Sequence, residues 1–228
     1  MKKLFTLFCI HCSLIAQSQN TNYWQQQCDY KIEVALNDTL HELNGFITID
    51  YKNNSPETLP FIYFHLWPNA YQNLSTPFSI QLLENGKTKF WFSKESQRGY
   101  MNGLSFTANA EVCKAEMDTG SVEICKVFLN QPLKTGETVR ISTPFHVKLP
   151  ETFSRMGHVG QSYQITQWYP KPAVYDKLGW HEMPYLDQGE FYSEYGNFNV
   201  TIQLPAAYKL AATGNLMSDS VSGTTRTA

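Results

Sequence analysis

The sequence predicts an all-β domain with one short helix. Aromatic residues make up 14% of the 228 residues, and they occur in short runs interrupted by glycine, proline and asparagine. Aromatic residues favour strands, and these interruptions are typical of turns. Several runs also alternate apolar with polar residues, which is the pattern of a strand with one buried face.

Three strands are predicted near the start of the mature chain. Region 30–36 alternates Tyr, Ile, Val and Leu with charged or small residues, which indicates a half-buried strand. A second strand is expected at 46–51, before a turn with the sequence Asn-Asn-Ser-Pro. The run at 61–67 is almost continuously apolar, as expected of a strand covered on both faces.

The best helical candidate is the segment 76–85, which ends before Gly86. Thr76 can serve as the N-cap, and Pro77 suits the first helical position because its fixed φ is already helical. The segment predicts one short helix.

The rest of the chain is predicted to be strands, followed by a weakly structured end. Further strands are expected at 104–115, 121–130, 137–149, 162–168, 191–204 and 207–213. Residues 218–228 are rich in Ser, Thr and Gly. We expect them to be a truncated or disordered end, because a β domain that stopped at 213 would leave an unpaired edge. A naturally disordered tail is the alternative.

Residues 1–18 are predicted to be a signal peptide. Two lysines precede the apolar stretch 4–16, and Ala16-Gln17-Ser18 forms a small-x-small cleavage site. The apolar stretch is too short for an ordinary membrane span, although a retained interfacial anchor is the alternative. We therefore expect an exported protein with no membrane span and one β domain at 19–217.

The charge composition argues against a nucleic-acid partner. The chain has 18 Lys and Arg against 20 Asp and Glu, a formal net charge of −2. Nucleic-acid binding calls for a basic stripe, and the sequence contains none.

Two cysteines are candidates for a disulfide. Cys113 and Cys125 flank a turn-forming stretch, Met117 to Ser121, between two strand-like runs. If the hairpin closes about Thr119, both cysteines stand six residues from its centre and face each other. An oxidising compartment would favour their pairing. Two free thiols are the alternative, and Cys28 is expected to be a small buried apolar residue.

No metal site is expected in this chain. A zinc site of the H-E-x-x-H type needs two His at i and i+4 on a helix, with a Glu between them as base. The pairs His41-Glu42 and His181-Glu182 both lack the second His.

Other polar residues are expected to be structural. Asp187, Glu190 and Glu194 would share one face only on a helix, and the Gly, Pro and aromatic residues around them indicate loop and strand. We expect a solvated or interface-facing acidic loop. His158 lies in a glycine-rich turn and is expected to be a polar loop residue.

Gln167 is the candidate substrate-binding residue. It lies near the end of the predicted strand at 162–168, just before Pro170 and Pro172. At such an exit a rigid sheet can present a side chain to a ligand. The amide offers a donor and an acceptor, so it can hold a substrate amine or carbonyl without itself ionising. From the residues alone, Gln167 can equally be a simple polar residue at a strand end.

Several motifs in order resemble the amino-terminal domain of aminopeptidase N-type zinc metallopeptidases, within the gluzincin clan. The likeness runs from about Tyr30 to Leu216 and is strongest to a secreted bacterial branch. The matching motifs are Asn53 to Pro56 leading into Leu59 to Leu66, then Thr166-Gln167, Trp168 to Pro172, Gly189 to Gly196, Pro205-x-x-Tyr208 and Ala212 to Asn215.

The resemblance implies a largely antiparallel, saddle-like β-sandwich that packs against a downstream thermolysin-like catalytic domain. In that family the Thr-Gln segment reaches the active-site cleft, where the Gln helps to bind the free amino end of the peptide substrate. That residue is Gln167 here. The zinc ligands and the catalytic Glu belong to the next domain, and none maps onto this chain. Many members carry an Arg and a Cys after the Thr-Gln; residues 168–176 contain neither.

A second function class stays open. A free-standing secreted β-sandwich with five Trp and 13 Tyr could bind carbohydrate or another protein. Under either interpretation, this chain alone is not expected to hydrolyse peptides.

Overall fold

The computed structural model describes residues 23–228, so the predicted signal peptide at 1–18 lies outside the described residues. The strands of the larger sheet are β1 (Gln27–Asn37), β2 (Glu42–Lys52), β4 (Tyr100–Asn102), β5 (Thr107–Ala108), β6 (Glu111–Val112), β9 (Thr138–Lys148), β15 (Phe198–Pro205), β16 (Ser220–Ser222) and β17 (Thr225–Thr227). Those of the smaller sheet are β3 (Leu59–His65), β7 (Ala115–Met117), β8 (Ile124–Leu133) and β12 (Lys171–Pro172). Two short hairpins are β10 (Gly157–Val159) with β11 (Ser162–Gln164), and β13 (Val174–Asp176) with β14 (Gly179–His181).

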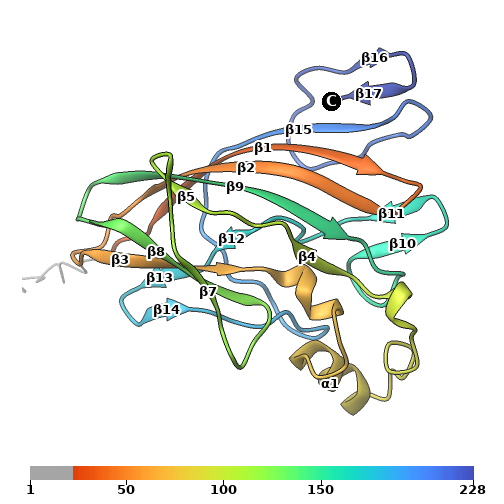
Figure 1. Ribbon diagram of the computed structural model, residues 1–228, viewed down its shortest axis with the longest axis horizontal. Helices are drawn as coiled ribbons and strands as arrows, with labels where there is room; N and C mark the ends of the chain where they lie inside the picture. Colours follow the sequence, from red (N-terminus) through yellow and green to blue (C-terminus); the bar gives the residue numbers. More distant parts are fainter. Residues whose placement is uncertain (1–22) are drawn as a thin grey trace, which may run out of the picture.

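The two sheets enclose a shared hydrophobic core (Figure 1). The larger has the order β16-β17-β15-β1-β2-β9-β5-β6, and β4 also pairs with β9; the smaller has the order β12-β3-β8-β7. Among the described strands only β1 and β15 pair in parallel. The predicted all-β class is confirmed, with mainly antiparallel sheets.

Strand β1 follows its sequence pattern. Cys28, Tyr30, Ile32 and Val34 are buried and alternate with more exposed residues, as the period-2 alternation predicts. Cys28 is a buried apolar residue, as expected.

Strand β3 is covered on both faces, which explains its continuous apolar run. Ile62 and Phe64 are fully buried in the core. On the other face, Trp180 of the β13–β14 hairpin lies against Phe61 and Tyr63, with ring centroids 6.1 and 5.7 Å apart. The strand starts and ends two residues earlier than predicted, and Trp67 begins the 3₁₀ helix Trp67–Tyr71.

The one α-helix among the described residues is α1 (Pro77–Glu84), as predicted. The Thr76 hydroxyl accepts a hydrogen bond from the Ser79 N–H at 3.3 Å, which satisfies one of the free donors of the first turn. A second 3₁₀ helix covers Glu95–Gln97. No helix in the described part of the chain is long and apolar enough to cross a membrane.

Several strand predictions were wrong in extent. The segment 104–115 contains two two-residue strands, β5 and β6, and the first residue of β7, because Asn109 and Ala110 adopt positive φ values and reverse the chain. Strand β15 begins only at Phe198. Before it, Gly196 passes so close to the Cys28 carbonyl that a Cβ would lie 1.6 Å from the oxygen, which leaves no room for another residue type.

The carboxyl-terminal end also differs from the prediction. No strand forms at 207–213, whereas residues 218–228, which were expected to be a truncated or disordered end, contain β16 and β17. Strand β17 pairs with β15, and the Arg226 guanidinium donates to the Tyr208 carbonyl at 2.6 Å. The hairpin turns at Gly223, which has a φ of +57°. Pairing with β15 therefore orders a polar sequence that carries no strand pattern of its own.

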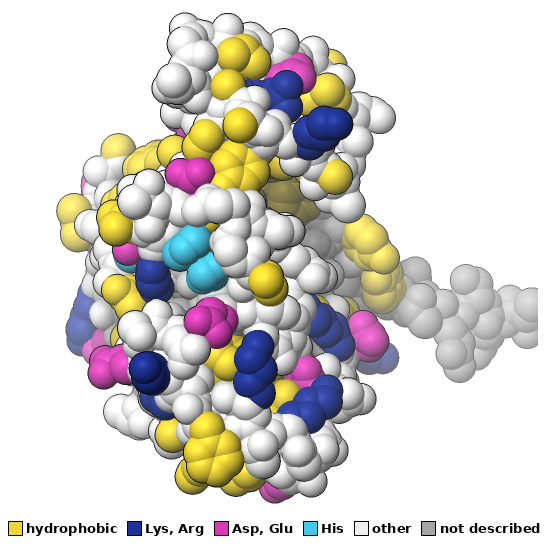
Figure 2. All heavy atoms as spheres, turned by 90° about the vertical axis from the view of Figure 1, so that its right-hand side faces the viewer, with side chains coloured by type: hydrophobic (Ala, Val, Ile, Leu, Met, Phe, Trp, Pro, Cys, Tyr) yellow, Lys and Arg dark blue, Asp and Glu magenta, His cyan; other side chains and the backbone are white. Residues whose placement is uncertain are grey.

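The β10–β11 hairpin rests against the turn between β1 and β2. His41 of this turn stacks on His158 of β10, and its Nδ1 lies 2.7 Å from the Tyr163 hydroxyl of β11. Figure 2 shows a face of the molecule on which histidine side chains are visible at the surface. His158 is thus a packing partner in a short strand, and the expectation of a polar loop residue was wrong.

Candidate functional site

Gln167 lies in an irregular bend between β11 and β12. The strand predicted at 162–168 ends at Gln164, so Gln167 is three residues beyond the sheet. Its φ is +53°, in the left-handed region that residues other than glycine rarely adopt. The preceding Thr166 fixes the bend by donating from its hydroxyl to the Arg155 carbonyl at 3.0 Å.

Lys171 contacts the side chain of Gln167 directly. Its Nζ donates to Gln167 Oε1 at 2.7 Å and to Ser193 Oγ at 3.2 Å. Because β12 pairs with β3 with Lys171 opposite His65, the backbone of Lys171 belongs to the smaller sheet. The amide of Gln167 is therefore tied to a rigid element.

Aromatic rings surround the Lys171 ammonium. Its Nζ lies 5.0 Å from the ring centroid of Trp67 and 5.2 Å from that of Tyr169, which is within range of a cation–π contact. The Trp67 ring is fixed in turn, because its Nε1 donates to the Met183 carbonyl and its face stacks on His65.

Burial sets the electrostatics of this site. Only 7% of Lys171 is exposed, and burial lowers its pKa to about 8. Burial, together with the nearby charge of Lys171, lowers the pKa of His65 to about 3. At neutral pH the site therefore holds one cation, with a neutral imidazole behind it.

The free hydrogen-bonding groups of Gln167 define what the site can bind. Lys171 uses one lone pair of Oε1, which leaves the second lone pair and the two amide N–H groups. The side chain is half-buried, so one part of it faces solvent. A ligand can therefore be held by hydrogen bonds without proton transfer from Gln167.

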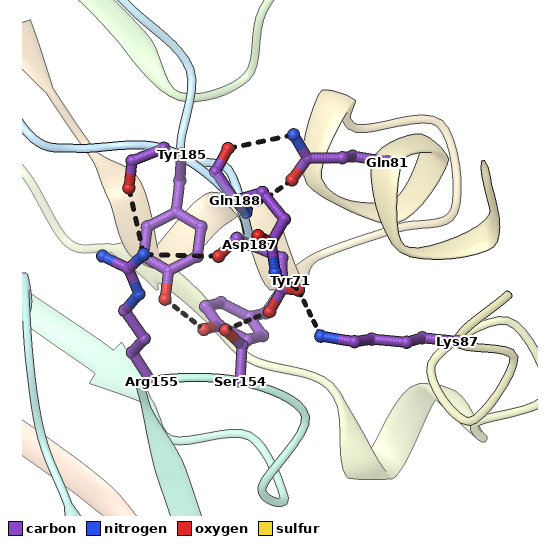
Figure 3. A network of polar contacts seen from close by, with 9 residues as sticks. Tyr71, Gln81, Lys87, Ser154, Arg155, Tyr185, Asp187 and Gln188 are labelled. Carbon is purple, nitrogen blue, oxygen red and sulfur yellow. Dashed lines mark hydrogen bonds and ion pairs between the residues drawn. The ribbon is translucent and has the colours of Figure 1, made fainter. Parts of the chain in front are cut away.

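A polar network that the sequence did not predict fastens residues 185–188, which precede Ser193 in the chain (Figure 3). Asp187 is only 8% exposed; it pairs with Lys87 at 2.6 Å and accepts from the Ser154 hydroxyl at 2.7 Å. These bonds hold the carboxyl charged and keep the pKa of Asp187 below its usual range, against the effect of burial. Gln81 of α1 and Gln188 exchange two hydrogen bonds, at 3.0 and 2.7 Å.

This network corrects the expectation of a solvated acidic loop. Asp187 and Glu194 are buried, and only Glu190 is exposed. Burial raises the pKa of Glu194. No three His, Cys, Asp or Glu side chains within residues 23–228 are grouped so that they could hold a metal ion.

The predicted disulfide between Cys113 and Cys125 is not formed, and both are buried free thiols, as is Cys28. The strand register places Met117 opposite Cys125, so the hairpin closes about Ser121 instead of Thr119. The cause is local, since the Asp118 carboxylate accepts from the Gly120 and Ser121 N–H groups and shifts the turn toward β8.

Comparison with known proteins gives structural similarity only. No family model matches the sequence, and no curated protein matches it. Solved structures that resemble the fold include a two-domain M1 zinc metallopeptidase in a mutant form bound to L-arginine, with 15% identity and a TM-score of 0.49. An M1 zinc metallopeptidase from Deinococcus radiodurans has 16% identity and a TM-score of 0.48. Its mutant bound to a Tyr-Ser-Ala substrate has 16% identity and a TM-score of 0.47.

Each of these matches covers 89% of this chain and 37% of the solved chain. This chain therefore spans well under half the length of the proteins whose fold it resembles.

Proposed function

We propose that this chain is the non-catalytic amino-terminal domain of an exported, zinc-dependent aminopeptidase. In this proposal the β domain packs against a downstream catalytic domain and closes one side of its cleft. Gln167 then helps to bind the free amino end of the peptide. The zinc is assigned to the downstream domain, since residues 1–228 contain no H-E-x-x-H motif.

The observation that carries the proposal is the conformation of Gln167. A left-handed backbone at a residue other than glycine costs on the order of 1 to 3 kcal/mol and persists only where the surroundings enforce it. Here the Thr166 hydroxyl holds the bend by donating to the Arg155 carbonyl. Such strain concentrates at ligand sites, and this residue is also the one that matches the Thr-Gln motif of the family that the sequence resembles.

The proposed role is positioning. A peptide amino group can donate to Gln167 Oε1, and the aromatic rings beside Lys171 exclude water from one side. Placing the amino end fixes the distance to the scissile bond, and small misplacements near the chemistry lower the rate strongly.

The arrangement of the tryptophans favours this proposal over a carbohydrate-binding module. Of the five, only Trp91 is exposed, while Trp67 is 2% exposed and the others are half-buried. Sugar binding by stacking needs accessible ring faces, and most of these rings are packed against neighbours.

The test is the substitution Gln167→Ala in the complete native protein. We expect kcat/KM for peptides with a free amino end to fall about tenfold or more, because a hydrogen bond to the amino group is lost. Inhibition by Nα-acetylated peptides should not change. Gln164→Ala is the matched control, since Gln164 is exposed on β11 three residues away. An unchanged kcat/KM in Gln167→Ala would sink the proposal.

A further inference from the structure

The oxygen of Gln167 that a peptide amino group would use already has an occupant. Lys171 Nζ lies 2.7 Å from Gln167 Oε1, and the pairing of β12 with β3 holds the backbone of Lys171 in place. The ammonium of Lys171 and the ammonium of a peptide are chemically alike. Both are short-range donors with a full positive charge.

The contacts of this ammonium are neutral. They are Gln167 Oε1, Ser193 Oγ and the faces of Trp67 and Tyr169. No ion pair to Lys171 forms within the part of the chain that the structure describes. A second cation at Gln167 would therefore be repelled by the Lys171 ammonium, because no carboxylate contacts Lys171 to neutralise its charge.

Two titratable groups face Lys171. His65 lies opposite it on β3, and Tyr169 belongs to its own segment. Burial keeps His65 neutral and raises the pKa of Tyr169 above its usual range. Lys171 is therefore the group here that changes charge at mildly alkaline pH.

We propose that Lys171 competes with the peptide amino group for the oxygen of Gln167, so that the site binds a free amino end weakly while Lys171 is protonated and tightly once it is neutral. This inference rests on the proposed function of Gln167 and names its regulation. It makes Lys171 a residue that determines how the site responds to pH and to the charge of the substrate amino group.

Two observations make the competition effective. The Lys171 ammonium bridges Gln167 Oε1 and Ser193 Oγ, so its retreat would free both oxygens at once. Burial also lowers the pKa of Lys171 to about 8, which brings its deprotonation close to the physiological range.

The kinetic test compares Lys171→Met with Lys177→Met in the complete native protein. Methionine keeps an apolar stem against Trp67 and Tyr169 and removes the charge, whereas Lys177 is exposed and serves as control. For a peptide with a free amino end, we expect KM at pH 7 to fall about tenfold in Lys171→Met, with kcat little changed. The ratio of the wild-type KM to the Lys171→Met KM should approach one above pH 9.

A raised or unchanged KM in Lys171→Met would overturn the proposal. A raised KM would make Lys171 a support for Gln167, and an unchanged KM would mean that its charge does not reach the substrate. Because the peptide amino group titrates near the same pH, the ratio between variants is the quantity to follow.

A measurement without catalysis separates this inference from the function on which it rests. The pKa of Lys171 can be followed by NMR of ¹³Cε-labelled lysine in the complete native protein, with and without a peptide. A free-amino peptide should lower this pKa and an Nα-acetylated peptide should not. If the peptide binds through Gln167 but the Lys171 pKa stays constant, the competition is excluded and the function stands. If no peptide binds, both the competition and the proposed function of Gln167 are excluded.

Discussion

His41 stacks face to face on His158, with ring centroids 3.7 Å apart and an angle of 12° between the ring planes. This contact links the turn between β1 and β2 to the β10–β11 hairpin, which leads directly into the bend that carries Gln167. Lys148 lies close by and donates to the Leu40 carbonyl. Two imidazoles and an ammonium thus meet at one junction.

This junction should weaken in acid. Burial, His158 and Lys148 lower the pKa of His41 below its reference value of 6.5, although Asp38 opposes them. A histidine with a lower pKa in the folded state binds fewer protons than in the unfolded state, so stability is lost as pH falls below about 6.5. We expect the amide protection factors in β10 and β11, which are corrected for the pH dependence of intrinsic exchange, to fall between pH 6.5 and 5. His158→Phe, which keeps a stacked ring, should reduce this fall; an equal fall in both proteins would contradict the contact.

Glu123 should impose the opposite pH dependence. Its carboxyl is fully buried with one oxygen accepting from the Tyr185 N–H at 2.6 Å, and burial raises its pKa to about 8. The folded state then binds more protons between about pH 4.5 and 8, so stability is lost as pH rises through 8. The loss is roughly 3 to 5 kcal/mol.

Glu123→Gln removes this dependence, because the amide stays neutral and its oxygen can still accept from Tyr185. Urea unfolding at pH 5 and pH 9 should show a larger change in the free energy of unfolding for the wild type than for Glu123→Gln. Glu84→Gln, an exposed control on α1, should behave as the wild type. If the free energy of unfolding changes equally between pH 5 and pH 9 in all three proteins, Glu123 does not titrate as described.

The cap of α1 gives a prediction independent of pH. Thr76 Oγ1 accepts from the Ser79 N–H and donates to the Ala70 carbonyl at 2.7 Å. Thr76→Ala should lower the free energy of unfolding by about 1 to 2 kcal/mol, and Thr76→Ser should restore most of it. The exposed Thr88→Ala is the control. Chemical denaturation that finds Thr76→Ala and Thr88→Ala equally stable would rule out the cap.

The stability of the protein should not depend on a reducing agent, because its described cysteines are free thiols. Cys28, Cys113 and Cys125 are buried free thiols. The unfolding midpoint should therefore be the same with and without a reducing agent, and thiol titration of the unfolded chain 19–228 should find three thiols. A tryptic peptide that joins Cys113 to Cys125 would show instead that the disulfide forms.

The parts of the fold that the sequence predicted correctly depend on local chemistry. The N-cap at Thr76 followed by Pro77 specifies the start of α1 within a few residues, and the alternation in β1 reports which face is buried. Both signals need no knowledge of distant residues.

The errors have a tertiary origin. Residues 218–228 have no strand pattern, yet β17 forms because β15 offers an unpaired edge. Asp187 pairs with Lys87, 100 residues earlier in the chain, so its burial could not be seen in its own neighbourhood.

The candidate site was predicted only in part. Gln167 stood out by its motif, but its contact with Lys171 depends on a positive φ that reverses the chain between them. Four residues of separation place side chains together in a helix, and this segment is not helical. A lysine between two prolines carried no sign of burial.

The most direct test of the central claim is hydrolysis of aminoacyl-p-nitroanilides and of their Nα-acetylated forms by the complete native protein, before and after a zinc chelator. We expect that only free-amino substrates are cleaved, that chelation abolishes the activity and that added zinc restores it. We also expect residues 19–228 alone to be inactive. A complete protein that cleaves no free-amino substrate under any of these conditions would contradict the account.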